Sequence, residues 1–281
     1  MASPWIAGLF ALFVWWFSTG AILWVVSRAD RSGRDGFVNA VVLGLPFLVA
    51  GGLGVWRSLG DPSVAGVYLG FLSALAIWGW IELAFLAGVI TGPYARPCPP
   101  GVEGWARFLR AWGTIAYSEM ALIAAAVLLV LASQEAANQV AMWTFLVLFA
   151  ARITAKINVY LGVPNINEEF LPSPVRHLST HFRKAPMNGF FPWSITLLTF
   201  ATACWIERLI EAPAGSGAAV GFALLAALTA LALFEHWMMV LPLPDAALWT
   251  WALPRTTSAP TTEAGRASAR LDDRILQGHD R

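Results

Sequence analysis

The segment 152-RITAKINVYLGVPNINEEFLPSPVRHLSTHFRKAPMNGFFPW-193 concentrates charge, histidine and proline in a chain that is otherwise apolar. Arg152 and Lys156 lie near the end of an apolar run. His177 and His181, two of the four histidines, follow four residues apart in a stretch broken by prolines. We therefore predict that this segment closes a polar pocket at one end of a bundle of membrane helices.

The composition places the chain among polytopic membrane proteins. Hydrophobic residues make up 58% of the 281 positions and charged residues only 12%, against about 25% charged in soluble domains. Several apolar runs reach about 20 residues, the length that crosses a bilayer as a helix. The expected fold class is an all-α bundle surrounded by membrane lipids. No basic stripe with interleaved aromatic residues points to nucleic acid.

Hydropathy and turn residues predict seven transmembrane helices. These are residues 5–27, 37–56, 64–90, 111–132, 139–161, 190–210 and 217–241. A short interfacial helix is expected at 104–110, and residues 175–182 could form a short helix. Residues 1–250 would then form the transmembrane domain and residues 251–281 a disordered cytoplasmic tail, because the tail is polar and rich in small residues. No internal repeat suggests a transporter.

Arginine and lysine alternate between the connections. They are abundant between the first and second spans, the third and fourth, and the fifth and sixth, and scarce in the other three connections. Basic residues favour the cytoplasmic side of a membrane. The pattern predicts a periplasmic N-terminus and a cytoplasmic C-terminus.

Polar side chains inside the spans fall in the cytoplasmic half of this topology. An ionisable residue in hydrocarbon costs roughly 2.5–3.5 kcal/mol on insertion scales, so it usually faces a partner or a cavity. The predicted intramembrane network is Glu82, Glu119, Arg152, Lys156, Asn158, Glu235 and His236. One interpretation is structural, with Glu82 and Glu119 neutralising Arg152 and Lys156, which share a helix face. The other is a ligand or metal pocket built on the same ion pairs.

Histidines and glutamates near this network are candidate ligands. His177, His181, His236, Glu168 and Glu169 could join the intramembrane glutamates in a carboxylate–imidazole site for iron or manganese. A histidine could instead ligate the magnesium of a chlorophyll-type pigment. No E-x-x-H motif and no desaturase-type histidine box is present. The sequence alone assigns no catalytic residue.

Two blocks of the chain resemble one known family. They are 158-NVYLGVPN-165, with EEFLP (168–172) and RHLSTHF (176–182) after it, and 234-FEHWMMVLPLPDAALW-249. Over about residues 5–250 the chain resembles the PuhE-type photosynthetic complex assembly proteins of purple phototrophic bacteria. The resemblance implies a membrane factor that helps to assemble the reaction centre and light-harvesting complex. It also implies bacteriochlorophyll handling, and partners among the subunits of that complex or the pigment-synthesis proteins.

Three hypotheses follow. The first is a non-enzymatic assembly factor in the bacterial inner membrane or the intracytoplasmic photosynthetic membrane. The alternative is a membrane metalloenzyme, a di-iron oxidase or hydroxylase that acts on a pigment or another lipid-soluble substrate. A transporter would have a suitable pocket but lacks the repeat symmetry.

Overall fold

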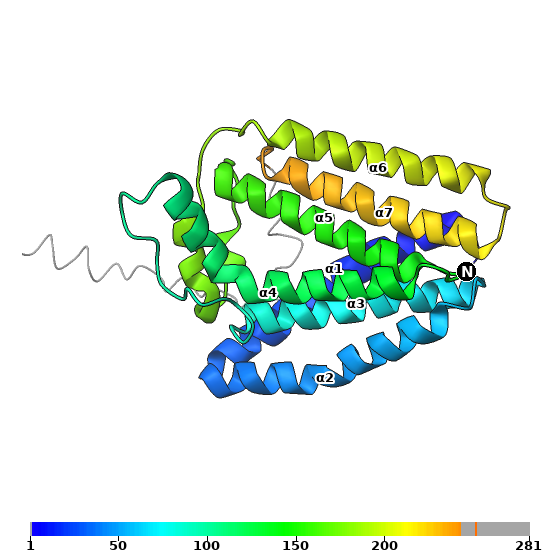
Figure 1. Cartoon of the computed structure of the whole chain (residues 1–281), viewed down its shortest axis with the longest axis horizontal. Helices are drawn as coiled ribbons and strands as arrows, with labels where there is room; N and C mark the ends of the chain where they lie inside the picture. The colour runs from blue at the N-terminus through cyan, green and yellow to red at the C-terminus, as the bar shows by residue number, and fades with distance from the viewer. Residues whose placement is uncertain (1, 243–250, 252–281) are drawn as a thin grey trace, which may run out of the picture.

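The computed structural model describes residues 2–242 and residue 251, without the side chain of Glu169. Within these residues the chain forms a bundle of long helices (Figure 1). The α-helices are α1 (Pro4–Arg31), α2 (Gly33–Ser58), α3 (Val64–Leu86), α4 (Gly104–Ala132), α5 (Val140–Leu161), α6 (Phe191–Glu211) and α7 (Gly217–Met238). Two 3₁₀ helices, η1 (Glu168–Phe170) and η2 (Ser173–His181), lie in the connection between α5 and α6.

Six of the described helices are long and apolar enough to cross a membrane, namely α1 to α5 and α7. The expected all-α, membrane-type architecture is therefore confirmed. The sixth expected span, α6, is not among these six. It lies beside α7 in the bundle (Figure 1) but carries Glu207, Arg208 and Glu211 near its end. The expected seven spans and the orientation of the termini stay predictions, and the expected tail lies mostly outside the described residues.

The first connection is more helical than expected. The sequence predicts a charged turn after residue 27, yet α1 continues to Arg31 and α2 begins at Gly33. No proline interrupts this stretch, so the helix continues into its polar end. The reversal needs only Ser32 and Gly33, whose φ of 70° lies in the left-handed region that glycine adopts without strain.

Helix α4 joins two segments that the sequence separates. The expected interfacial helix at 104–110 is continuous with the span that follows it, and α4 bends sharply between the two parts (Figure 1). At the bend Tyr94 N–H donates to the Gly113 carbonyl, and the Tyr117 N–H donates to the Thr91 carbonyl. The loop therefore bonds two backbone groups of α4 that would otherwise bond within the helix. Such an interruption of the helical hydrogen bonds is a recognised cause of a kink.

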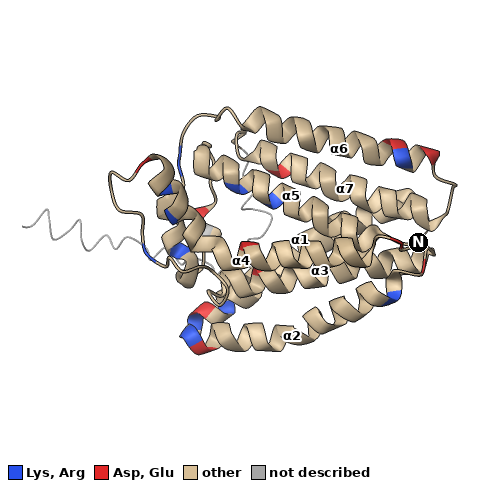
Figure 2. Ribbon diagram, in the orientation of Figure 1, with Lys and Arg blue, Asp and Glu red and all other residues tan. Residues whose placement is uncertain are grey.

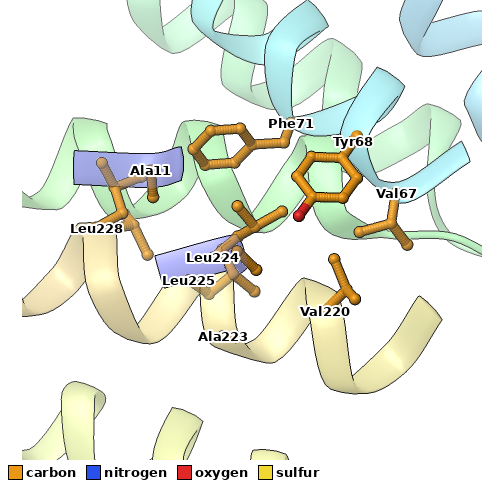
Figure 3. Close-up of a cluster of buried hydrophobic side chains, with 11 residues drawn as sticks. Ala11, Val67, Tyr68, Phe71, Val220, Ala223, Leu224, Leu225 and Leu228 are labelled. Atoms are coloured by element: carbon orange, nitrogen blue, oxygen red, sulfur yellow. The ribbon is translucent and has the colours of Figure 1, made fainter. Parts of the chain in front are cut away.

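The core surrounds α7. Tyr68 and Phe71 extend from α3 toward Leu224 and Leu225 of α7, and Ala11 of α1 completes the contact (Figure 3). Phe71, Leu224 and Ala11 are fully buried. Because lipid tails are as apolar as leucine, close packing rather than water exclusion holds such helices together.

Glycines allow α2 to approach α3 closely. A β-carbon at Gly51 would lie 2.9 Å from the Ser73 carbonyl oxygen, and one at Gly54 would lie 2.1 Å from the Ser73 hydroxyl. Small residues at a helix contact serve this purpose in membranes.

Candidate functional site

Two glutamates and two cations meet between α3, α4 and α5. Arg152 of α5 forms an ion pair with Glu82 of α3, and its Nε lies 3.3 Å from Oε1 of Glu119 on α4. Lys156, one turn further along α5, binds the same Glu119 oxygen. The Glu119 side chain is completely buried, and the Arg152 and Glu82 side chains are 12% and 16% exposed. The ion pairs expected from the sequence therefore form.

Aromatic rings support the cations. The Arg152 guanidinium carbon lies 5.1 Å from the Phe85 ring centroid and 5.8 Å from that of Trp78, and Lys156 Nζ lies 5.0 Å from the Phe85 centroid. These distances fall within the range of cation–π attraction. Two charges of each sign are held together, so the cluster has a formal charge of zero when all four groups are ionised. The compensation reduces the cost of keeping charge in the membrane.

His236 joins α7 to α5. Its Nδ1 lies 2.7 Å from the Ala232 carbonyl and its Nε2 lies 2.9 Å from the Thr154 hydroxyl. A carbonyl only accepts, so Nδ1 donates the proton and in the neutral ring Nε2 is the acceptor. The side chain is 2% exposed. A metal at Nε2 would have to displace Thr154.

Asn158 joins α5 to the beginning of α6. Its amide nitrogen donates to Ser194 Oγ at 2.8 Å, and its amide oxygen accepts from Asn188 at 3.1 Å. Asn188 Oδ1 in turn accepts from the N–H groups of Phe190 and Phe191, which caps α6. The predicted polar residue Asn158 therefore organises helix ends rather than the charge cluster.

The connection from Gly162 to Gly189 is attached to the helices by hydrogen bonds from side chains to main-chain carbonyls. Arg107 of α4 donates to the carbonyls of Tyr160 and His181, at 3.1 and 2.8 Å, and its guanidinium lies over the Tyr160 ring. Asn165 donates to the carbonyls of Met238 and Leu241 at the end of α7. The connection therefore closes one end of the bundle, as predicted.

His177 and His181 do not share a helix face in the expected way. Both histidines lie in the 3₁₀ helix η2, which has three residues per turn. Side chains four residues apart in such a helix point in directions that differ by about 120°. His181 is 4% exposed, and its Nε2 lies 3.4 Å from the Arg96 carbonyl. Burial lowers the pKa of His181 below its usual value, and the Arg96 carbonyl opposes this shift. Burial also lowers the pKa of His177, opposed by the carbonyls of Pro174 and Tyr94.

The predicted ligands do not converge on a metal centre in the described part of the chain. No three histidine, cysteine, aspartate or glutamate side chains there are grouped closely enough to hold an ion. Glu168 pairs with Lys184 at 2.8 Å instead, and the side chain of Glu169 lies outside the described residues. An iron or manganese site does not fit this donor set.

A cavity of about 570 Å³ lies between α1, α3, α5, α7 and the Gly162–Gly189 connection. Its walls are largely apolar, with Trp15, Leu75 and Phe170 among them. Arg152 and Glu82 of the charge cluster line it, together with Glu235 and His236 of α7. The predicted polar residues of three helices thus reach one cavity, whereas Glu119 and Lys156 do not line it.

Comparison with known proteins places the chain in a family. Residues 1–260 match the protein family of unknown function DUF3623. The chain belongs to this family. It is 51% identical to a protein of Rhodobacter capsulatus over 271 residues, which are 96% of this chain and 98% of the relative. That relative is described as an uncharacterized 30.4 kDa protein in the puhA 5′ region. No solved structure matches the chain.

Several residues that organise the DUF3623 fold were not predicted. The helices α4, α5, α6 and α7 are connected through Arg107, Thr154, Asn188 and Ser194. Of these four side chains only that of Arg107 is charged. Serine and threonine are common in membrane helices, so their presence carries little signal. The spacing of Asn188 and Pro192, with three residues between them, could have indicated a helix start, because an asparagine followed by a proline near the first turn is a capping pattern.

Proposed function

We propose that this chain is a multi-pass membrane factor that assists assembly of the photosynthetic reaction centre and its light-harvesting complex. The observation that carries the proposal is the relative from R. capsulatus, a purple phototroph, whose gene lies beside the photosynthesis gene puhA. Near-complete coverage of both chains at 51% identity supports a shared role. The PuhE-type blocks at residues 158–182 and 234–249 support the same role.

The geometry is compatible with a scaffold that holds hydrophobic partners. Each charge in the Glu82–Glu119–Arg152–Lys156 cluster has a protein partner, which favours a structural use of the cluster. His236 is engaged at both ring nitrogens. The partners would be subunits of the photosynthetic complex or pigment-synthesis proteins, and bacteriochlorophyll handling is part of the proposal.

The proposed membrane is the bacterial inner membrane or its intracytoplasmic extension. Lysine and arginine gather at the end of the bundle that holds the α1–α2, α3–α4 and α5–α6 connections (Figure 2). By the positive-inside rule this end is cytoplasmic and the N-terminus is periplasmic. Reporter fusions at Gly189 and Gly215, on opposite sides of α6, test whether α6 crosses the membrane: alkaline phosphatase should be active only at Gly215.

The assembly role is tested by deleting the gene in a purple phototroph. Cells without it should contain fewer assembled reaction-centre complexes, measured by membrane absorbance and blue-native gels, while transcripts of the subunits stay at wild-type levels. An affinity-tagged chain should co-purify reaction-centre subunits during complex synthesis. Unchanged complex levels in the deletion strain would refute the proposal.

A matched pair of variants links this role to the bundle. Glu135 lies in the exposed turn between α4 and α5, so Glu135→Gln should restore assembly as well as the wild-type gene. Glu119→Gln makes the same chemical change at a completely buried site and should restore it poorly. Equal rescue by both variants would show that assembly does not require the charge cluster.

A further inference from the structure

We infer that the cavity between α1, α3, α5 and α7 is a binding site for one neutral, lipid-soluble molecule that has a carbonyl or ester oxygen at one end and an apolar body. The cavity volume of about 570 Å³ lies within the range of ligand sites in proteins, roughly 300–1,000 Å³. This inference concerns the isolated protein and does not depend on the assembly role.

The walls of the cavity select an apolar body. Each of the four helices presents one face to it, with residues at helical spacing. On α1 these are Trp15, Ser18, Thr19, Ile22 and Leu23, and on α3 they are Leu75, Trp78, Gly79, Glu82 and Leu86. From Leu75 to Leu86 the wall extends about 16 Å along the helix axis, at 1.5 Å per residue. This length accommodates an extended chain or a flat ring system with a tail.

One side chain of the cavity wall, Arg152, carries hydrogen-bond donors that its ion pairs do not use. Its guanidinium contacts Glu82 through Nη1 and Glu119 through Nε. Nη2 is buried without a hydrogen-bond partner among the described residues. A guanidinium has five N–H groups, so Arg152 retains donor capacity after both ion pairs form. A ligand oxygen next to this group would accept a hydrogen bond.

Charge balance decides between a neutral and an anionic head. The two glutamates Glu82 and Glu119 already compensate Arg152 and Lys156. Glu235 adds another carboxyl group to the cavity wall. A carboxylate or phosphate that entered the cavity would add a further negative charge to a low-dielectric site. The free-energy cost of burying that charge exceeds the stabilisation from one hydrogen bond to Arg152. A neutral carbonyl oxygen carries no such cost.

Gly79 provides a variant that fills the cavity and leaves the charge cluster intact. A β-carbon there would meet only Ile22 Cδ1, at 3.6 Å, which is an ordinary contact. A leucine side chain would extend from this position into the cavity. Gly52 is the matched control, because it is an exposed helical glycine with nothing within 4 Å of an added β-carbon. Both changes replace a helix glycine in a membrane-type helix with leucine.

The experiment measures binding of decylubiquinone, a neutral quinone with a ten-carbon tail, to purified chain in lipid nanodiscs. Quenching of tryptophan fluorescence reports occupancy, since Trp15 and Trp78 line the cavity. The wild type and Gly52→Leu should show a saturable component above linear partitioning into lipid. Gly79→Leu should weaken that component by about tenfold or more, because its side chain occupies the space of the ligand.

Competition tests the head group. Methyl laurate and laurate have the same chain and differ in charge at pH 8, and the neutral ester should displace the quinone at about tenfold lower concentration. Thermal unfolding of both glycine variants verifies that they fold. Purely linear quenching in the wild type, or saturable binding unchanged in Gly79→Leu, would overturn the site. Laurate competing as well as its ester would overturn the neutral ligand class.

Discussion

Replacing Glu119 with glutamine should destabilise the bundle more than any other single change in the charge cluster. One oxygen of Glu119 is shared by Arg152 and Lys156, and the side chain is completely buried. Glutamine has nearly the same shape, so the loss is one of charge rather than of volume. Two cations would then face Glu82 alone. Leaving a buried charge without its partner costs about 3–5 kcal/mol.

Removing a cation together with Glu119 should be milder than the sum of the single changes. Lys156→Met alone should cost about 1–2 kcal/mol, because the lysine side chain is 28% exposed and Glu119 keeps Arg152 as a partner. In the Glu119→Gln/Lys156→Met double variant, the remaining Arg152–Glu82 pair is neutral. We expect a coupling free energy of about 1–3 kcal/mol.

The assay is unfolding of the purified chain by dodecyl sulfate in mixed micelles, followed by far-ultraviolet circular dichroism. The four proteins of the cycle give the free energies of unfolding, and Glu135→Gln in the exposed turn is the control for the chemical change itself. The control should unfold at the wild-type midpoint. Strictly additive effects of Glu119→Gln and Lys156→Met would show that the two side chains do not stabilise each other, and the structural interpretation of the cluster would be wrong.

Three further predictions concern the beginning of α6 and the connections between helices. Asn188→Ala removes the cap of α6 and should lower the free energy of unfolding by about 1–2 kcal/mol in the same assay, whereas a wild-type midpoint would refute the capping role. His177 and His181 have lowered pKa values in the folded chain, so protons bind the unfolded chain more readily. Stability should therefore fall as the pH drops below about 6.5; a His177→Gln/His181→Gln variant should lose this part of the pH dependence, and an identical profile would contradict it. A β-carbon at Gly92 would lie 2.2 Å from the Gly113 carbonyl oxygen, so Gly92→Ala should lower the thermal midpoint in detergent while Gly52→Ala leaves it unchanged, and equal midpoints would refute the proposed loop contact.

Sequence patterns predicted the membrane helices because their signal is strong. A run of about 20 apolar residues has few alternatives to a membrane helix, and six of the seven expected spans begin and end within four residues of an observed α-helix, the exception being the start of α4. The signal was weaker where polar residues continue a helix. Arg28 and Arg31 suggested a turn, and Arg107 and Arg110 suggested an interfacial segment, but helices α1 and α4 include them. Charge marks the membrane surface, not the end of a helix.

The bend in α4 could not be predicted from the sequence of α4 itself. Its cause is the backbone of residues 91–94, which bonds to Gly113 and Tyr117. A hydrogen bond between segments about 20 residues apart leaves no periodic pattern in either of them. The same limit applies to Asn188, which reaches Asn158 and Gly162 from the far side of a long connection.

The candidate site was predicted in part because intramembrane charge is rare and costly. Their positions along the predicted helices placed Glu82, Glu119, Arg152 and Lys156 at a similar depth in the membrane. In the structure these four side chains form ion pairs. Depth does not give the direction in which a side chain points. His236 and Glu235 are neighbours at the same depth, yet both ring nitrogens of His236 are engaged by Ala232 and Thr154. A histidine at the right level is therefore not a free ligand.

The same reasoning explains why a compensated cluster and a ligand site can share Arg152. The ion pairs use two of its three nitrogens, and the guanidinium carbon lies 5.8 and 5.1 Å from the ring centroids of Trp78 and Phe85. With its charge neutralised, the group still donates hydrogen bonds but no longer favours anions strongly. Such a donor suits a neutral oxygen in an apolar cavity, where water would otherwise compete for it. A network that stabilises the helices can thus also set the chemical class of the molecule that enters between them.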